Sequence, residues 1–223
     1  MSDASIETSI RPDILPLGDA ALLVRFGAVL DDSANQAALA LAERLRDDPI
    51  AGVVEVVPSL ISVLLRYDPR AADFPRLAGE VRLRLGGVRT AAVPREHVIK
   101  ARFGDEAGPD LVEVAALLQL DPQGFVDAHC AIPLRVLTTG FAPGFVYCGF
   151  HRESLVLPRR REVRREVPIG SILFAAGQTA ITATEVPTGW HVIGRTEFRN
   201  FDPRFWPPTT MMAGDTVSFE VDA

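Results

Sequence analysis

The sequence predicts an α+β protein with two domains, a small α/β domain over residues 1–93 and a mostly β domain over 94–223. Strand and helix patterns alternate as far as residue 93. After Pro94, helical patterns occur only in two short segments, which are followed by many brief strands. The length of 223 residues is sufficient for two domains that each bury a core.

The first domain begins with a predicted strand over 20–26, where apolar residues dominate. Asp32 and Ser33 then provide an N-cap, with Gln36 in the position of a capping box. The apolar residues of the helix recur at helical spacing and are Ala34, Ala38, Leu41, Ala42 and Leu45. The helix ends before Pro49, because proline disfavours helical geometry in the preceding residue.

Two β-branched runs follow, over 52–57 and 60–66, and a tight turn separates them. A second helix is predicted over 73–85, with an apolar stripe formed by Phe74, Leu77, Val81 and Leu85. Gly86 and Gly87 end this helix, and 88–93 forms a last strand. The resulting order, βαββαβ, predicts a ferredoxin-like domain whose two helices cover one face of the sheet.

The second domain begins with two short helices, for which Asp110 and Asp121 are the expected N-caps. Their apolar stripes consist of Leu111, Ala115 and Leu118 in the first, and of Phe125, Val126 and His129 in the second. Strands are then expected over 133–138, 171–175, 180–183, 190–195 and 216–221. Many short strands separated by glycine and proline predict a barrel or a sandwich.

Composition excludes several classes of protein. The formal net charge of -6 comes without a basic stretch interleaved with aromatic residues, so nucleic-acid binding is not expected. Two cysteines are too few for a disulfide scaffold, and the first residues lack the pattern of a signal peptide, so we expect a cytoplasmic protein. No apolar run approaches the ~20 residues of a membrane-spanning helix, so no contact with a membrane is expected.

The strongest local signal is the segment TGFAPGFVYCG at 139–149, which combines glycines, a proline and aromatic residues. This composition favours a shaped loop over a helix or a strand. Phe141, Phe145 and Tyr147 could line a ligand pocket, or they could form a small satellite core beneath a buried turn. Cys148 has no base beside it in the sequence and is interpreted as a packing residue.

Two further segments carry polar groups suited to binding. In the first, Gln178 and Thr179 follow an apolar run and Gly177, where they could bind a carboxylate, an amide or a phosphate, or form an ordinary turn. The second is the run PRRREVRRE at 158–166. Its planar guanidinium groups could hold an anion, and the alternatives are a solvated face or a surface for partner docking.

His129 lies on the apolar stripe of its helix, so its ring is expected to point inward as a core side chain. If it borders a pocket instead, it could transfer protons near neutral pH, because the unperturbed pKa of histidine is about 6.5. The other histidines lack the spacing of metal ligands, and no metal is predicted; they are His97, His151 and His191.

Several ordered motifs together resemble the KipI/PxpB family, which is also described as a 5-oxoprolinase component, as allophanate hydrolase subunit 1 and as carboxyltransferase domain, subdomain C and D. The motifs are GPDL at 108–111, GFAPGFVYCG at 140–149, PRR at 158–160, VPIGS at 167–171, GQT at 177–179, TGW at 188–190, IGRT at 193–196 and FDP at 201–203. The sequence departs from the family pattern at Val146, Phe150 and Val163, and at 180–183, in loops expected to line the pocket. A paralogue that acts on another amide or urea-like compound is therefore an alternative.

The resemblance implies a small α/β domain followed by a cyclophilin-like β-barrel. It also implies a non-autonomous subunit of a bacterial ATP-dependent 5-oxoprolinase, which converts 5-oxo-L-proline to L-glutamate with a KipA/PxpC-like subunit and a PxpA-like third component. ATP would act at the level of this hetero-oligomer, with no cofactor bound by the chain alone. The alternatives are a carboxyltransferase-type subunit of a urea carboxylase or allophanate hydrolase system, with biotin on a partner, and a KipI-like histidine-kinase inhibitor.

In the implied reaction, ATP phosphorylates the lactam oxygen, and arginine and polar loop groups stabilise the developing negative charge. Matched by motif, the implied catalytic residues are His129, Arg159, Gln178, Thr179 and Arg195. The implied substrate-binding residues are Phe141, Pro143, Gly144, Phe145, Tyr147, Gly177 and Trp190. Neither a nucleophile nor a base is assigned among them. A partner interface should also expose apolar side chains.

Overall fold

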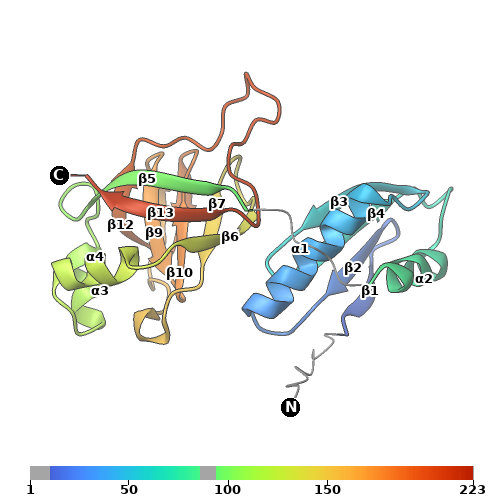
Figure 1. The fold of residues 1–223 in the computed structure, drawn as a ribbon, viewed down its shortest axis with the longest axis horizontal. Coiled ribbons are helices and arrows are strands. Elements are labelled where there is room, and N and C mark those ends of the chain that lie inside the picture. The colour runs from blue at the N-terminus through green and yellow to red at the C-terminus, as the bar shows by residue number, and fades with distance from the viewer. Residues whose placement is uncertain (1–10, 86–93, 223) are drawn as a thin grey trace, which may run out of the picture. The chain divides into compact units, whose positions relative to one another are not determined.

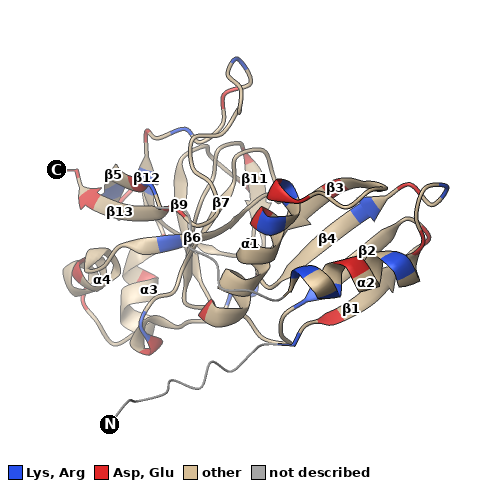
Figure 2. Cartoon of the chain, turned by 45° about the vertical axis from the view of Figure 1, so that its right-hand side comes forward, with Lys and Arg blue, Asp and Glu red and all other residues tan. Residues whose placement is uncertain are grey.

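The computed structural model describes residues 11–85 and 94–222 and divides into two compact units, Met1–Ala92 and Val93–Ala223 (Figure 1). Each unit encloses its own hydrophobic core. Basic and acidic residues are interspersed along both units rather than gathered on one of them (Figure 2). Within the described ranges, no helix is both long and apolar enough to cross a membrane.

The described part of the first unit contains a four-stranded antiparallel sheet in the order β1-β2-β4-β3. Its elements are β1 (Asp13–Leu17), β2 (Ala21–Arg25), α1 (Asp32–Asp47), β3 (Val53–Pro58), β4 (Ser62–Tyr67) and α2 (Phe74–Arg84). Alternate residues of the central strands, such as Leu22 and Val63, are buried in one core with the apolar stripe of α1. Period-2 strands and a period-3.6 helix thus present matching apolar faces.

The structure corrects two details of this unit. The helix α1 begins at Asp32, and its N-cap is Asp31, whose Oδ1 accepts a hydrogen bond from the backbone N–H of Ala34 at 2.9 Å. The unpredicted strand β1 forms a hairpin with β2 and occupies the sheet edge beside it. The expected helix stop at Gly86 and Gly87 and the expected strand over 88–93 lie outside the described residues. The ferredoxin-like assignment therefore stays a prediction.

In the second unit, seven strands of the described region close into a barrel in the order β10-β7-β6-β13-β5-β12-β9. They are β5 (Glu96–Phe103), β6 (Leu134–Thr139), β7 (Val146–Gly149), β9 (Ser171–Ala175), β10 (Gln178–Ile181), β12 (His191–Thr196) and β13 (Thr216–Val221). The pairing of β13 with β5 is parallel, and the other barrel pairings are antiparallel. This closed barrel confirms the α+β class and agrees with the cyclophilin-like expectation.

The remaining elements cover the barrel. The helices α3 (Leu111–Leu117) and α4 (Pro122–Cys130) lie together against it (Figure 1), and their apolar residues join the core inside the barrel. A short 3-10 helix spans Glu153–Leu155. A two-stranded sheet of β8 (Arg164–Val167) and β11 (Val186–Thr188) contributes Val167 and Val186 to a second cluster on the outer side of the barrel wall.

Strand alternation separates the two faces of the barrel wall. In β9, Ile172 and Phe174 point into the barrel core, whereas Leu173 and Ala175 belong to the outer cluster. In β10, Ile181 is inside and Ala180 is outside. Every functional residue on these strands can therefore be assigned to one face.

Three sequence-based expectations for this unit were wrong or incomplete. The segment 139–149 was expected to be a loop, but its last four residues form β7, because pairing with β6 and β10 satisfies their backbone groups. The strand β5 was not predicted. Asp121 caps α4 by accepting from Gly124 N–H at 2.6 Å, but the side chain of Asp110 makes no cap hydrogen bond to α3.

Candidate functional site

Four aromatic rings and one guanidinium group form a continuous row on the outer side of the barrel wall, here called the aromatic row. The ring centroids of Phe141 and Phe145 are 5.5 Å apart, those of Phe145 and Tyr147 are 4.8 Å apart, and those of Tyr147 and Trp190 are 5.9 Å apart. The Arg159 guanidinium carbon lies 5.6 Å from the Trp190 ring centroid, within the range of a cation–π contact. Phe141, at one end of the row, is 70% exposed.

Small residues and a constrained turn make room for this row. Tyr147 pairs across the sheet with Ala180, whose short side chain leaves space above the wall. Gly144 has φ +69°, and a Cβ built there would lie 2.5 Å from Cβ of Phe201, so only glycine fits. Its carbonyl accepts a hydrogen bond from Nδ2 of the buried Asn200 at 3.1 Å. The sequence-predicted residues Phe141, Gly144, Phe145, Tyr147 and Trp190 are thus brought together, and Pro143 is exposed in the same turn.

Gln178 adds an unpartnered donor on the same side of the wall. It alternates with the inward Thr179, so it shares the outer face of β10 with Ala180. Its side chain is buried, and its Nε2 has no hydrogen-bond partner. A buried amide donor without a partner is expected to meet a water or a ligand atom. Gly177 supplies the hairpin before it, because Ala176 and Gly177 both have positive φ, as a type I′ turn requires.

The electrostatics of the row favour a neutral phenol beside a fixed cation. Burial raises the pKa of Tyr147, and the positive charge of Arg159 offsets part of that rise. The Tyr147 hydroxyl therefore stays protonated at neutral pH and can donate a hydrogen bond. A guanidinium, a phenol and an amide in one region can together recognise a small molecule that carries a carboxylate and a carbonyl oxygen.

Arg159 is positioned by the residues on both sides of it in the segment 158–167, here called the strap. The backbone N–H of Arg160 donates to the carbonyl of Gly189 at 2.7 Å, and Nε2 of His191 donates to the carbonyl of Pro158 at 3.2 Å. These two hydrogen bonds tie the backbone on either side of Arg159 to the backbone on either side of Trp190.

A buried carboxylate anchors the strap from below. Oδ1 of Asp110 accepts from Nη1 of Arg160 at 2.7 Å and from Nη2 of Arg164. Oδ2 of Asp110 accepts from the backbone N–H of Val192 at 2.8 Å. Asp110, expected to be a helix cap, is therefore the anchor of the strap, and two of the five arginines in the run at 158–166 serve structure. This signal was missed because Asp110 and Arg160 meet only through tertiary packing.

Thr179 and His129 lie together on the opposite, inner face of the barrel wall. Nε2 of His129 and Nε2 of His151 each lie 2.8 Å from Oγ1 of Thr179. A hydroxyl has a single proton, so it donates to one ring and accepts from the other, and the two histidines must be opposite tautomers. Both rings are buried beside Phe174.

Burial sets the charge state of this pair. It lowers the pKa of His129 well below its usual value, with a contribution from the neighbouring His151. It lowers the pKa of His151 to about 4, so both rings are neutral at pH 7. The interpretation of His129 as a satisfied core side chain agrees with this geometry. His151 follows β7 without any periodic pattern, and no sequence signal identified it.

Arg195 lies apart from both groups, on the outer face of β12, where it pairs across the sheet with Arg102 of β5. The candidate residues thus fall into three sets: the aromatic row with Arg159 and Gln178, the buried pair His129 and Thr179, and Arg195. Cys148 is buried, and burial raises the pKa of its thiol to about 12, which fits a packing role. Residues 11–85 and 94–222 hold no cluster of three metal-ligating side chains.

A barrel of this order, preceded by a small α/β unit and carrying these motifs on its wall, defines a class of subunits with a carboxyltransferase-type domain. The family described as "Carboxyltransferase domain, subdomain C and D" matches residues 12–211, and the chain belongs to this family. In Bacillus subtilis, a protein named as the second, B-type component of 5-oxoprolinase is 32% identical over 95% of this chain and 93% of its own length. In Escherichia coli, a protein of the same name is 33% identical over 91% of this chain and 93% of its own length.

Solved structures agree with this assignment. The protein TTHA0988 is 32% identical, with a TM-score of 0.80, over 91% of this chain but only 40% of its own. The chain thus spans less than half the length of TTHA0988. The urea amidolyase of K. lactis has a TM-score of 0.80 at 16% identity, over 96% of this chain and 15% of its own, a likeness that shows the fold alone.

Proposed function

We propose that this chain is a subunit of a bacterial, cytoplasmic, ATP-dependent 5-oxoprolinase, which opens the lactam ring of 5-oxo-L-proline to give L-glutamate. The observation that carries the proposal is the similarity, over more than nine-tenths of both chains, to proteins named as 5-oxoprolinase components in two bacteria. The proposed partners are a KipA/PxpC-like subunit and a PxpA-like third component.

The aromatic row supports a substrate-binding role in this reaction. A five-membered lactam is flat and small enough to pack against the Tyr147 and Trp190 rings, which lie at an aromatic contact distance. The carboxylate of 5-oxoproline would pair with Arg159. The unpartnered Nε2 of Gln178 would donate to a ligand oxygen and thereby remove a buried unsatisfied group.

ATP, when bound to the complex, supplies the phosphoryl group that makes the lactam carbonyl electrophilic. Arg159 is the one cation found in contact with the rings of the row among the described residues, and one guanidinium suits a single carboxylate better than a triphosphate. We therefore assign ATP to a surface completed by the partners. In this proposal His129 and Thr179 do not touch the substrate, and they position β10 and with it Gln178.

Exposed apolar side chains support assembly with a partner. Phe205 and Trp206, in the long connection between β12 and β13, are 66% and 94% exposed. Phe141 at the end of the aromatic row is also exposed. Such side chains are costly in water and typical of interfaces. TTHA0988 carries more than half of its sequence beyond the part that matches this chain, as a fused partner would require.

A second candidate function is that of a carboxyltransferase-type subunit acting on urea or a related amide, with biotin carried by a partner. The likeness to the K. lactis urea amidolyase, which covers 96% of this chain, favours it. The departures from the family pattern at Val146 and Phe150 lie next to Tyr147 and concern the same choice of substrate.

The proposal is tested by co-expressing the chain with KipA/PxpC-like and PxpA-like subunits from the same host and measuring ADP and glutamate formation with 5-oxoproline. Arg159→Met should raise KM for 5-oxoproline by about tenfold, because a charge-assisted pair is lost. Arg161→Gln, which removes an exposed arginine of the strap, is the matched control and should leave KM unchanged. A complex that ignores 5-oxoproline but carboxylates urea with biotin would favour the second candidate.

A further inference from the structure

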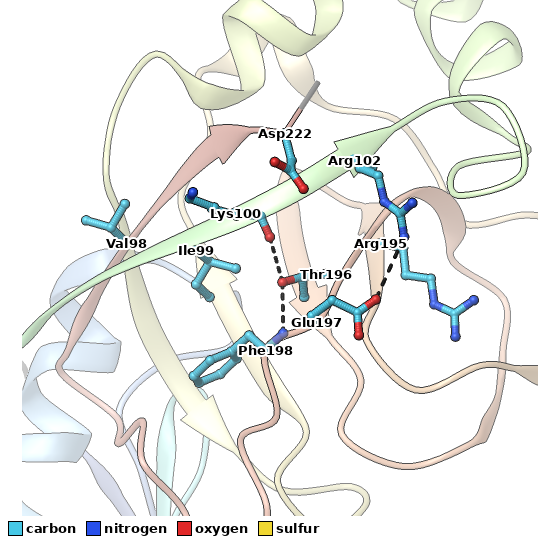
Figure 3. A pocket seen from close by; sticks show the side chains of 9 residues that line it. All are labelled: Val98, Ile99, Lys100, Arg102, Arg195, Thr196, Glu197, Phe198 and Asp222. Atoms are coloured by element: carbon cyan, nitrogen blue, oxygen red, sulfur yellow. Dashed lines mark hydrogen bonds and ion pairs between the residues drawn. The ribbon is translucent and has the colours of Figure 1, made fainter.

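A pocket of about 240 Å³ lies on the outer face of the barrel between β5 and β12, away from the aromatic row (Figure 3). Its polar lining consists of Lys100, Arg102, Arg195, Glu197 and Asp222, and Phe198 and Ile99 form an apolar wall. No member of this lining belongs to the aromatic row or to the strap.

Two arginines face each other in this pocket. Arg195 of β12 is the cross-strand partner of Arg102 of β5. Like charges directly opposite each other on neighbouring strands destabilise a sheet unless something neutralises them. Figure 3 shows the two side chains extending on the same side of the pocket, whereas the ammonium group of Lys100 points toward Val98.

The acidic side chains of the pocket leave most of this charge unneutralised. Glu197 is 82% exposed, and its carboxylate lies 3.7 Å from Arg102 and 3.7 Å from Arg199, so each ion pair is long and solvated. Nε of Arg195 is buried without a hydrogen-bond partner. Among the residues that the structure describes, no carboxylate forms an ion pair with Arg195.

We propose that this pocket binds a phosphate group of a small ligand between the guanidinium groups of Arg102 and Arg195. A planar guanidinium donates two parallel hydrogen bonds to an oxyanion, and two guanidinium groups match the charge of about −2 of a phosphate better than that of a carboxylate. The phosphate would satisfy Nε of Arg195 and displace the weakly held Glu197 from Arg102. The body of the ligand would pack against Ile99 and Phe198.

The test is a titration of the full chain, without partners, with inorganic phosphate at constant ionic strength, followed by NMR of the arginine Nε–H groups. We expect a saturable shift of the Arg195 Nε–H resonance. Arg195→Met and Arg102→Gln should each weaken phosphate binding by about tenfold, the loss of a charge-assisted pair. Glu197→Gln should strengthen it by about threefold, because a competing carboxylate is removed. Lys100→Gln is the matched control and should change affinity by less than about twofold, since its ammonium points elsewhere.

Three outcomes would overturn the assignment: no saturable phosphate binding, equal affinity in the arginine variants and the parent, or tighter binding of acetate or glutamate than of phosphate. If Arg195→Met does not fold, the opposite effects of Arg102→Gln and Glu197→Gln decide the question. The assignment uses no residue of the proposed substrate site. Its failure would leave oxoproline-dependent ATP turnover by the complex intact, and the converse also holds.

Discussion

The hydroxyl of Thr179 determines the hydrogen-bonding state of two buried histidines. It lies 2.8 Å from Nε2 of His129 and 2.8 Å from Nε2 of His151, and the rings around the pair offer no polar alternative. A buried polar group without a partner costs more than a satisfied one contributes. The side chain at this one position therefore supports polar groups that lie 50 and 28 residues away in the sequence.

Replacing Thr179 with valine should destabilise the barrel, because valine has the same shape but leaves two ring nitrogens unpaired. We expect a loss of about 2–4 kcal/mol in the free energy of unfolding, from roughly 1–3 kcal/mol for each unsatisfied group. Thr179→Ser keeps the hydroxyl and should lose only about 1 kcal/mol, the value of a buried methyl group. Urea denaturation followed by tryptophan fluorescence measures both. Equal losses in the two variants would contradict the role of the hydroxyl.

At this scale the sequence predicts direction better than contact. The helical stripe of α4 correctly predicts that His129 faces the interior. Its contact with Thr179 depends on the register of β10 within a closed barrel, which no local pattern encodes. Asp110 has the residue type of a helix cap, but its partners Arg160 and Arg164 reach it only after the strap has folded over α3.

Among the elements, the strap is held by one carboxylate. Asp110 accepts hydrogen bonds from two arginines of the strap and from the backbone of Val192. Removing one partner from a buried ion pair leaves uncompensated charge, which costs far more than an exposed pair contributes. Because the strap carries Arg159, its order determines whether the aromatic row retains its cation.

The variant Asp110→Asn should release the strap and move Arg159 away from Trp190. We expect a loss of about 3 kcal/mol in stability, as for a broken buried ion pair, and a change in Trp190 fluorescence. Trypsin should cleave faster after the strap arginines, as mass spectrometry of the fragments would reveal. Glu113→Gln is the control, because it removes only an exposed carboxylate 3.8 Å from Arg160. An unchanged cleavage pattern in Asp110→Asn would refute this anchoring role.

Elements with clean periodicity were predicted, and elements defined by their neighbours were not. The stripe of α1 and the alternation of β13 correspond closely to the predicted residues. By contrast, β7 contains Gly149 and follows a glycine-rich turn, and it becomes a strand only through pairing on both sides. The strand β1 includes Pro16 and has largely exposed residues, so it lacks the alternation that indicates a strand.

For the molecule as a whole, the four histidines provide a difference between the two units. All four lie after residue 93, two of them at the hydroxyl of Thr179. Both tryptophans also belong to the barrel unit, so tryptophan fluorescence reports its unfolding alone. The two cores can therefore be followed separately as the pH changes.

Acid should destabilise the barrel between pH 6.5 and about pH 4, the pKa of His151 in the folded chain. Because the pKa values of His129 and His151 are lowered by folding, the unfolded chain binds protons at a higher pH than the folded one. The free energy of unfolding therefore falls as the pH drops through this window, by about 1.4 kcal/mol per pH unit for each histidine. Urea denaturation at several pH values measures the slope.

His151→Gln should reduce that slope by about one proton while leaving the first unit unaffected. The first unit, with no histidine, is the internal control, and its unfolding is followed by amide exchange. A slope that stays unchanged in the variant would show that the pKa of His151 is not lowered by folding.

The pairing of β13 with β5 has a consequence for how the chain is made. Thr216 pairs with Glu96, so the barrel cannot close until residues 120 positions apart have both left the ribosome. At a synthesis rate of roughly 5–20 residues per second, β5 waits about 6–24 s for its partner. During this interval the growing chain presents an open strand edge, to which a nascent-chain chaperone or another copy could bind. The first unit lies ahead of this delay and can fold while the barrel is still being translated.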